Sequence, residues 1–567
     1  MNMKANIQPI VIITLILTGL FIFKAFPVKG QAKNEEVTII APYIPSIQNA
    51  SKIPLRPEIS PREQDNAQFD YQYISKSIPV TTELDPIDPM KFSEDRKEDL
   101  YGNYLKGGFG NYTTPYLEFL AGSRQSEKYV FSARLKHHSS QGNIKDYANS
   151  AFSHNLVSAY GAAFTKNGTL SGNIGYNRDV VHYYGFPLDS FPDVEISDDD
   201  LKQRFQHFNL AVGFEGQSKS KERLSYRLGT DFHFFNDRYE TREIQYDLNA
   251  GIDKRFSSSN KDFSHALGID VGLEYLGYKD SLVTYSPLII DFIPVYHFGF
   301  GKYSFEVGLK LYFTSSADTA GKRTLQIDEY PHIKAEIEII EGKLKVYAMV
   351  DGNKQVNSYR SLTGFNPFIT STPDIINTDQ QIRISGGLTG NAGGFNFNAE
   401  VAYSYNKNMP LFVNDTSLEL QNKFLVIYDD VNLLNIKASI GILKIKGLEA
   451  KLTVGLYQYI PKNEEKAWQL PSYEVGLDAR YVIKEKFILN GNILVLGTRY
   501  ARDYDETGEM AVKLKPAVDL SLGFEYRITP RISVFVNVNN ILNQHYQRWF
   551  NYPVQGIQGM VGASFSF

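Results

Sequence analysis

The chain has 567 residues, a formal net charge of −4 and no cysteine. The near-neutral charge gives no electrostatic case for nucleic acid as a partner, and the lack of cysteine excludes disulfides, thiol catalysis, structural zinc sites and a lipoprotein anchor. The mean hydropathy of −0.29 is too polar for a helical membrane protein, but it suits a membrane β-barrel, in which only every second strand residue meets lipid.

The N-terminus predicts export from the cytoplasm. Lys4 precedes an apolar run from Ile10 to Phe23, and small residues follow at Gly30 and Ala32. A basic start, an apolar middle and a small-residue cleavage point are the layout of a secretory signal peptide. The run of about 14 residues is shorter than the roughly 20 that a spanning helix needs. We therefore expect residues 1–30 to be a signal peptide rather than a retained membrane helix.

Residues 31–100 differ in composition from the rest of the chain. They contain eight of the 24 prolines and little sustained hydrophobic periodicity. Because each proline fixes φ and removes a backbone donor, we expect an irregular or extended segment. It forms either a periplasmic arm or a segment that folds back into a lumen. One β-branched stretch within it, suited to edge pairing with a partner or to an ordinary strand, consists of Glu35, Glu36, Val37, Thr38, Ile39, Ile40 and Ala41.

From about Asn103 onward, apolar and polar residues alternate with period two, which is a strand signal. Clear examples are 129–136, 267–274 and 518–527. A membrane barrel turns its polar face toward a wet lumen and its apolar face toward lipid, whereas a soluble multi-sandwich protein is the alternative. The charges on the second face either pair across neighbouring strands or select what passes. They are Arg134, Glu215, Arg227, Asp231, Asp270, Glu274, Lys334, Glu336, Glu338, Glu400, Glu525 and Arg527.

The connections support a barrel of about 22 strands, counted from Asn103 to Phe567, and closure with both ends on one side requires an even number. Short turns are predicted at 166–168, 341–342, 393–394, 446–447, 484–485 and 529–530. Long polar connections are predicted at 139–154, 181–203, 357–378, 412–425, 461–470, 502–512 and 542–556. Outer-membrane barrels alternate tight periplasmic turns with long external loops in this way. The expected fold is an all-β, antiparallel transmembrane β-barrel over 101–567, with both mature termini periplasmic.

The C-terminal stretch resembles the end of the barrel of TonB-dependent receptors. The likeness lies in Asn540 to Tyr546 (NILNQHY), the aromatic loop after it, and a last strand with Val561, Ala563, Phe565 and Phe567 on one face. The segment Tyr104 to Phe119 is similar to the opening of the barrel in a plug-poor branch of that superfamily. The resemblance implies an outer-membrane location in a Gram-negative cell, contact with lipid, and reading of Phe565 and Phe567 by the barrel assembly machinery.

The chain departs from this family before the barrel. In the family a globular plug precedes and fills the barrel, but only about 70 residues separate the signal peptide from the first strand here. The stretch from Glu35 to Ala41 is similar to a TonB box, which implies TonB or another periplasmic or outer-membrane protein as a partner. Nothing recognisable as a plug follows it, so energised import by plug movement is not predicted.

No catalytic or cofactor-binding motif is recognisable. His137 and His138 are adjacent on a strand and point to opposite faces, as rim residues do. Five carboxylates, Asp193, Glu195, Asp198, Asp199 and Asp200, crowd one loop, which is either solvated or a Ca²⁺ site. An aromatic set, Tyr546, Trp549, Phe550 and Tyr552, is interpreted as an interfacial girdle, with a ligand-stacking surface as the alternative. We expect no enzyme activity and no cofactor.

The sequence therefore predicts a barrel that allows uptake or passage of a solute across the outer membrane. Residues 31–100 would gate or partly fill the lumen, and the lumen charges would select the solute. The alternative is a non-transporting structural or docking subunit of a larger outer-membrane transport, secretion or assembly complex.

Overall fold

The computed structural model describes residues 101–567, except 124–125, 193, 218–223, 261, 318–321, 443 and 506–507. The predicted signal peptide, the Pro-rich segment and the stretch from Glu35 to Ala41 lie outside the described residues. In the described part of the chain, no helix is long and apolar enough to cross a membrane.

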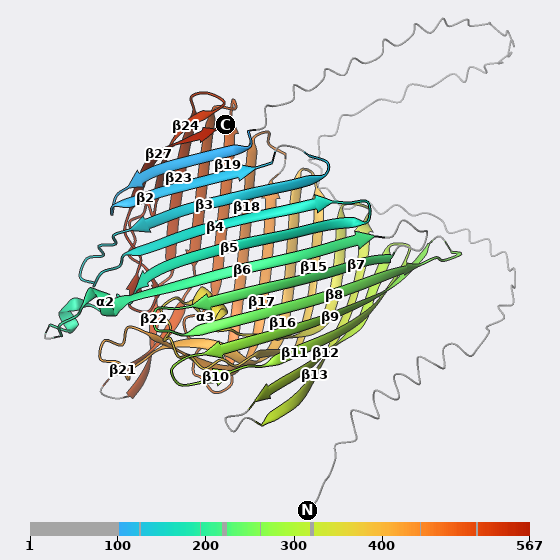
Figure 1. The fold of residues 1–567 in the computed structure, drawn as a ribbon, viewed down its shortest axis with the longest axis horizontal. Coiled ribbons are helices and arrows are strands. Elements are labelled where there is room, and N and C mark those ends of the chain that lie inside the picture. Colours follow the sequence, from blue (N-terminus) through green and yellow to red (C-terminus); the bar gives the residue numbers. More distant parts are fainter. Residues whose placement is uncertain are drawn as a thin grey trace, which may run out of the picture. The chain divides into compact units, whose positions relative to one another are not determined.

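The fold is a closed antiparallel barrel (Figure 1). Its sheet has 23 strands, but the two-residue β10 pairs only with β9, so 22 strands form the barrel wall. The expected count is confirmed. The wall strands are β1 (Asn103–Gly110), β2 (Thr114–Gly122), β3 (Tyr129–Ser140), β4 (Phe152–Phe164), β5 (Gly168–His182), β6 (Lys202–Gln217), β7 (Leu224–Asn236), β8 (Arg242–Phe256), β9 (Phe263–Lys279), β11 (Leu288–Phe300), β12 (Tyr303–Ala317), β13 (Arg323–Ile340), β14 (Leu344–Gln355), β15 (Thr378–Ala392), β16 (Phe395–Asn414), β17 (Phe424–Ile442), β18 (Leu448–Pro461), β19 (Tyr473–Ile483), β20 (Phe487–Leu496), β23 (Ala517–Arg527), β24 (Ile532–Asn539) and β27 (Gln558–Ser566).

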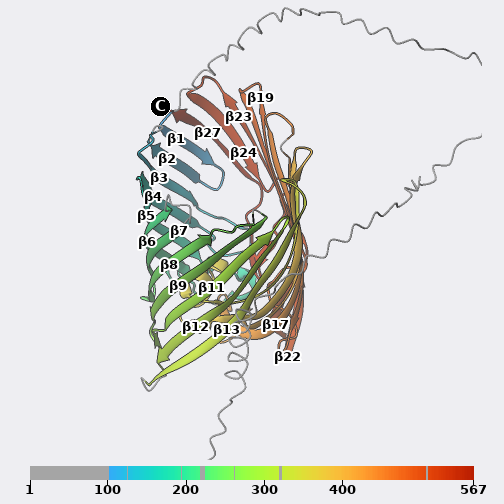
Figure 2. The same cartoon turned by 90° about the vertical axis from the view of Figure 1, so that its right-hand side faces the viewer.

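The last strand closes the barrel against the first (Figure 2). β27 pairs with β24 on one side and with β1 on the other, and Tyr104 lies opposite Ser566. The backbones of Asn103 and Phe567 exchange two hydrogen bonds of 3.0 Å. This seam leaves no free sheet edge, which a bilayer would not tolerate because it offers no hydrogen-bond partners. The predicted pairing of the final strand with the first strand near Tyr104 is confirmed.

The strand register separates an apolar exterior from a polar lumen. Glu118 lies opposite Lys136 and forms an ion pair of 2.6 Å with Arg134 on the lumen face. Leu117 and Leu135 lie on the other face and are exposed. The same parity holds around the wall, because each lumen residue lies opposite a lumen residue on the next strand. The alternating segments predicted from the sequence therefore have the expected orientation.

Short turns lie at one end of the barrel and long connections at the other. We call the end with the short turns, where β1 begins and β27 ends, the terminus end, and we call the opposite end the loop end. All six predicted turns lie at the terminus end, where Gly342 and Gly447 adopt φ of +64° and +79°, which glycine permits without strain. The loop end carries 3₁₀ helix η1 (Leu188–Ser190), α2 (Asp198–Leu201), β10 (Thr284–Tyr285), α3 (Tyr359–Phe365), β21 (Arg499–Asp505), β22 (Gly508–Leu514), β25 (Gln547–Trp549) and β26 (Tyr552–Pro553).

The long connections also fall where they were predicted, with one difference in kind. Residues 502–512 were expected to be a polar loop, but 502–505 and 508–512 belong to the paired strands β21 and β22, in which Arg499 lies opposite Leu514. This hairpin forms a sheet of its own. Its strands bury Ala501 and Leu514 in the interior of the loop end, so packing there stabilises a structure that the local polarity does not predict.

The seam provides a matched test of barrel closure. A Cβ on Gly562 would lie 2.2 Å from the Gly107 carbonyl oxygen and 2.4 Å from the Phe535 ring, whereas a Cβ on Gly559 of the same strand meets nothing within 4 Å. Gly562→Ala should destabilise the barrel by about 1–3 kcal/mol through overpacking, and Gly559→Ala should not. The loss of stability is measured on gels, as the shift in the temperature at which half of the barrel loses its heat-modifiable migration. Equal midpoints for the two variants would contradict the close packing of the seam.

Candidate functional site

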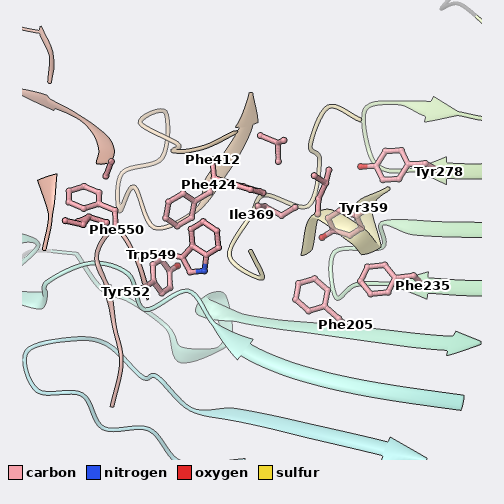
Figure 3. Packing of buried hydrophobic residues seen from close by; sticks show 14 residues of the cluster. Phe205, Phe235, Tyr278, Tyr359, Ile369, Phe412, Phe424, Trp549, Phe550 and Tyr552 are labelled. Carbon is pink, nitrogen blue, oxygen red and sulfur yellow. The ribbon is translucent and has the colours of Figure 1, made fainter. Parts of the chain in front are cut away.

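The loop end of the barrel is closed by its own connections. A buried cluster, which we call the cap, joins wall strands to the loops 356–377, 497–516 and 540–557. Figure 3 shows Phe412, Phe424, Trp549, Phe550 and Tyr552 gathered on one side and Tyr359 near Phe205, Phe235 and Tyr278 on the other. The members are Phe205, Phe235, Tyr278, Tyr359, Leu362, Ile369, Phe412, Phe424, Val426, Ala501, Leu514, Trp549, Phe550 and Tyr552.

The aromatic residues near the last strand belong to this cap. Trp549, Phe550 and Tyr552 are at most 9% exposed. The Tyr552 ring stacks on Phe368 with centroids 3.7 Å apart, and its hydroxyl donates to the Asn422 carbonyl oxygen. The prediction of an interfacial girdle is therefore wrong for these residues, and so is an open stacking surface. They turn inward because the wide mouth of the barrel offers a large apolar volume to fill, whereas the sequence shows only that they are aromatic and close to a strand.

A buried polar network holds the cap to the wall. Asp237 on the connection between β7 and β8 accepts hydrogen bonds from the Tyr359 hydroxyl (2.8 Å) and from Gln203 Nε2 (3.0 Å). The same Gln203 nitrogen lies 3.1 Å from the hydroxyl oxygen of Tyr183 and 3.1 Å from that of Ser371. Burial raises the pKa of Tyr359 and of Tyr183 well above the ordinary value. Both phenols therefore stay neutral, and the network links four separate segments of the chain.

Helix α3 is anchored inside the barrel at its first turn. Ser358 and Ser361 form a capping box, which satisfies two of the free N–H groups of the helix start. Glu243 on β8 accepts a further hydrogen bond of 2.6 Å from the Tyr359 N–H, and it is only 1% exposed. The wall strand therefore fixes the position of the loop that fills the mouth.

The part of the lumen toward the terminus end is hollow. One cavity of about 750 Å³ lies along β15 to β24, and a second of about 430 Å³ shares Asn398, Ser439 and Lys451 with it. A third, of about 570 Å³, lies along β1 to β6 near Tyr104. Amide side chains recur in the cavity of about 750 Å³, and within the described residues four of them, Asn396, Asn398, Asn490 and Asn537, make no side-chain hydrogen bond. This wall therefore offers neutral donors and acceptors to whatever occupies the lumen.

The predicted lumen charges all lie on the lumen face, and many of them are paired. Arg134 binds Glu118, Arg227 binds both Asp253 and Asp270 at 2.6 Å, and Glu400 binds Arg383. Lys334 lies 3.2 Å from Glu336. Near the terminus end, Glu525 accepts from Ser533, Arg527 donates to the Glu485 carbonyl oxygen, and Glu338 accepts from the Gly342 N–H. Glu215 lies opposite Arg227 in the register. A role in solute selection stays a prediction.

Three carboxylates on adjacent strands form a different arrangement. Asp231, Asp247 and Glu274 lie opposite one another on β7, β8 and β9. No ion pair joins them to a described cation; instead Gln245 donates to Glu274 at 2.9 Å and accepts from Arg360 of α3 at 2.7 Å. This row makes one side of the lumen acidic below the cap. In the described part of the chain, no group of three or more His, Asp or Glu is arranged to hold a metal ion.

The remaining sequence candidates take structural positions. His138 faces the lumen and packs edge-on against Tyr116, while His137 lies within 2.7 Å of the Asn155 side-chain oxygen on the other face. In the acidic loop, Asp199 forms a two-pronged ion pair with Arg238, which lowers the pKa of that carboxyl. Asp198 accepts from Asn149. Asp193 lies outside the described residues.

The residues that organise the cap were not predicted as a site. Gln203, Asp237 and Glu243 lie at strand ends, where a polar residue looks like an ordinary rim residue. The one local signal was Ser358, a residue type that is favoured at the N-cap of a helix. Even this signal does not reveal that the helix lies inside the barrel.

The sequence matches no protein-family profile and no curated protein. Its fold matches several solved structures. The FrpB iron transporter from Neisseria meningitidis (F3-3 variant) aligns with a TM-score of 0.62 and 11% identity, over 82% of this chain and 81% of that chain. The pyoverdine outer membrane receptor FpvA from Pseudomonas aeruginosa PAO1 aligns with a TM-score of 0.61 and 11% identity, over 82% of this chain and 78% of that chain. The ferric-catecholate import receptor Fiu from E. coli K12 aligns with a TM-score of 0.60 and 10% identity, over 82% of each chain.

At these identities the likeness concerns the fold. The described residues form a barrel with the fold of TonB-dependent receptors, and the resemblance drawn from the C-terminal stretch is confirmed. These neighbours are receptors and transporters rather than enzymes. The barrel and its neighbours support a location in the outer membrane.

The Tyr359 hydroxyl tests how firmly the cap is held. Tyr359→Phe keeps the ring but removes the donor to the buried Asp237 carboxylate, at a cost of about 1.5–3 kcal/mol. Hydrogen exchange of residues 358–371 should then accelerate by about tenfold to a hundredfold. Tyr405→Phe is the matched control, because that hydroxyl donates to Asp430 at 3.2 Å outside the cap. Unchanged exchange in Tyr359→Phe would show that the network does not hold the cap.

Proposed function

We propose that this protein passes a polar solute across the outer membrane through its lumen, with the cap as the closed gate at the external end. In this proposal both termini and the short turns lie on the periplasmic side. The observation that carries it is the division of the lumen into a hollow polar part and a packed apolar cap. A barrel of 22 strands is too wide for its wall side chains to fill, so the space left near the terminus end is suited to a solute.

Two features of the cap are consistent with a gate rather than with a permanent seal. Its apolar cluster comes from separate loops, each joined to the wall at both ends. Its polar network places Asp237 and Glu243 beneath α3 without a direct cation partner among the described residues. Loops that are held in this way can open when a few contacts are lost, and the loops that move in proteins belong to the less stable parts of a fold.

Residues 31–100 are proposed to contribute the second obstruction. Tyr101, the first described residue, lines the cavity of about 570 Å³ along β1 to β6. The paired lumen charges and the row of Asp231, Asp247 and Glu274 would favour cationic or neutral solutes.

The alternative role, as a structural or docking subunit of a larger outer-membrane complex, gains no specific support from the described residues or from the structural neighbours. The structural neighbours include an iron transporter and an import receptor. Their fold supports transport as the class of activity, while the substrate of this chain is open.

Planar-bilayer conductance tests the proposal. The intact protein should stay closed, and a variant that lacks residues 31–100 and has 358–375 replaced by a short Gly-Ser linker should give stable conductance steps. Each single change should open the barrel less than the two together. The control replaces Lys484 and Glu485, which have positive φ in a terminus-end turn, with Asn and Gly. A double variant that inserts normally and stays closed would refute passage through the lumen.

The TonB-box-like stretch gives a separate prediction. If Glu35 to Ala41 binds TonB by edge pairing, the full chain should retain the purified periplasmic domain of TonB in a pull-down, and a chain lacking these seven residues should not. A scrambled stretch of the same composition is the control. Equal retention by all three chains would show that this segment does not bind TonB, and the conductance result would be unaffected.

A further inference from the structure

The outer face of β5 to β9, which lie side by side (Figure 1), carries a row of polar residues near the loop end. Each member of the row lies opposite the next member on the neighbouring strand. The row contains three permanent cations and no carboxylate, although the whole chain carries a net charge of −4. Its members are Arg178, Gln206, Asn236, Arg242 and Lys279.

This row lies where the apolar outer surface ends. On β5, Tyr176 faces outward and is exposed, and Arg178 is the next outward residue toward the loop end. On β8, Tyr246 and Ile244 are exposed on the outer face, and Arg242 follows them in the same direction. Tyrosine is enriched where the hydrocarbon of a membrane meets its headgroups. We therefore place the row at the level of the lipid headgroups.

A fourth cation, Arg204, lies next to the row on the same outer face of β6. It is two residues nearer the loop end than Gln206, and it lies opposite Val180 of β5. Because Arg178 lies opposite Gln206, the two arginines are diagonal neighbours on adjacent strands, with Cα atoms about 7–8 Å apart. Two arginine side chains at this separation on one face can reach a single phosphate group.

The neutral side chains of the row are bonded, but these two arginines are not. Gln206 Nε2 donates to the Tyr176 hydroxyl at 2.7 Å, and Asn236 Nδ2 donates to Gln206 Oε1 at 3.4 Å. The side chains of Arg178 and Arg204 form no ion pair and no hydrogen bond with a described residue. Both residues are partly exposed. Their guanidinium groups are therefore available to a ligand outside the wall.

Two other cations at the loop end do have carboxylate partners. Arg238 pairs with Asp199 at 2.5 Å, and Lys462 pairs with Asp430 at 3.1 Å. The absence of a carboxylate beside Arg178 and Arg204 is therefore a local property of this part of the outer face. A partly buried charge without a counter-ion is unfavourable, so an anion from outside the chain would stabilise this site.

We propose that Arg178 and Arg204 bind the phosphate group of a lipid in the surrounding leaflet, with Arg242 as a third positive charge beside them. Guanidinium groups bind phosphate oxygens through charge-assisted hydrogen bonds, and basic residues at a membrane surface attract anionic headgroups. A lipid suits this place because its acyl chains would cover the apolar outer surface on the terminus side of the arginines. The site lies outside the lumen and does not depend on passage of a solute.

Native mass spectrometry of the purified full chain, released from an uncharged detergent, tests this proposal. The probes are dioleoyl phosphatidic acid and dioleoyl phosphatidylcholine, which have the same acyl chains. The unmodified chain should retain phosphatidic acid in preference to phosphatidylcholine. Arg178→Gln/Arg204→Gln should lower the affinity for phosphatidic acid by about tenfold to thirtyfold, because two cations that face the headgroup are lost.

The matched control is Lys462→Gln/Lys466→Gln. It removes the same charge from two loop-end lysines that pair with Asp430 and Glu465, and it should bind phosphatidic acid as the unmodified chain does.

Two further variants separate binding from folding. Arg178→Lys/Arg204→Lys keeps the charge and should retain more affinity than the glutamine variant. Arg242→Gln changes an exposed residue and should lower the affinity by about threefold to tenfold, so it tests the site even if the glutamine double variant does not fold. Heat-modifiable migration on gels shows which variants form the barrel.

Equal retention of the two lipids by the unmodified chain would overturn the proposal, and so would equal affinity in the test and control variants. Displacement of phosphatidic acid by millimolar inorganic phosphate, with saturable binding of inorganic phosphate alone, would assign a soluble anion instead and would contradict a lipid site. None of these outcomes depends on whether the lumen conducts.

Discussion

The requirement that every strand has two hydrogen-bonded neighbours controls this structure. A bilayer offers no partner to a free sheet edge, so the wall must close, and it closes where β27 meets β1. Gly108 and Gly562 keep this seam narrow, since Phe535 packs across it from the lumen side. The constraint also fixes the even strand number and puts both chain ends of the barrel at the same end. Every other feature is built on a wall of that size.

Closing 22 strands creates a second problem, because the interior is wider than wall side chains can fill. The wide interior is filled differently at the two ends of the barrel. At the loop end, long connections turn inward and form an apolar cluster, which a buried polar network joins to the wall. At the terminus end the wall stays polar and hollow, with ion pairs between neighbouring strands and unpaired amides along β15 to β24. Function is expected at the boundary between these two regions.

Charge is distributed according to the same division. In the lumen, arginines and lysines lie next to carboxylates on adjacent strands, as with Arg227, Asp253 and Asp270, so most of the field is cancelled locally. Asp231, Asp247 and Glu274 below the cap lie opposite one another on adjacent strands and form no ion pair with a described cation. Uncompensated charge is expensive in a partly buried site. Its presence in this row makes the row one part of the lumen that is suited to meet a ligand.

The sequence by itself determined the features that depend on neighbours along the chain. Period-two alternation identified the strands and their lumen charges, turn residues such as Gly342 and Gly447 located the short connections, and the final Phe567 identified the closing strand. The cap was decided only by tertiary structure. Tyr552 bonds to Asn422 across 130 residues of sequence, and Gln555 to Ser140 across 415. Local composition carries no information on such contacts, so the same aromatics were interpreted as a membrane girdle.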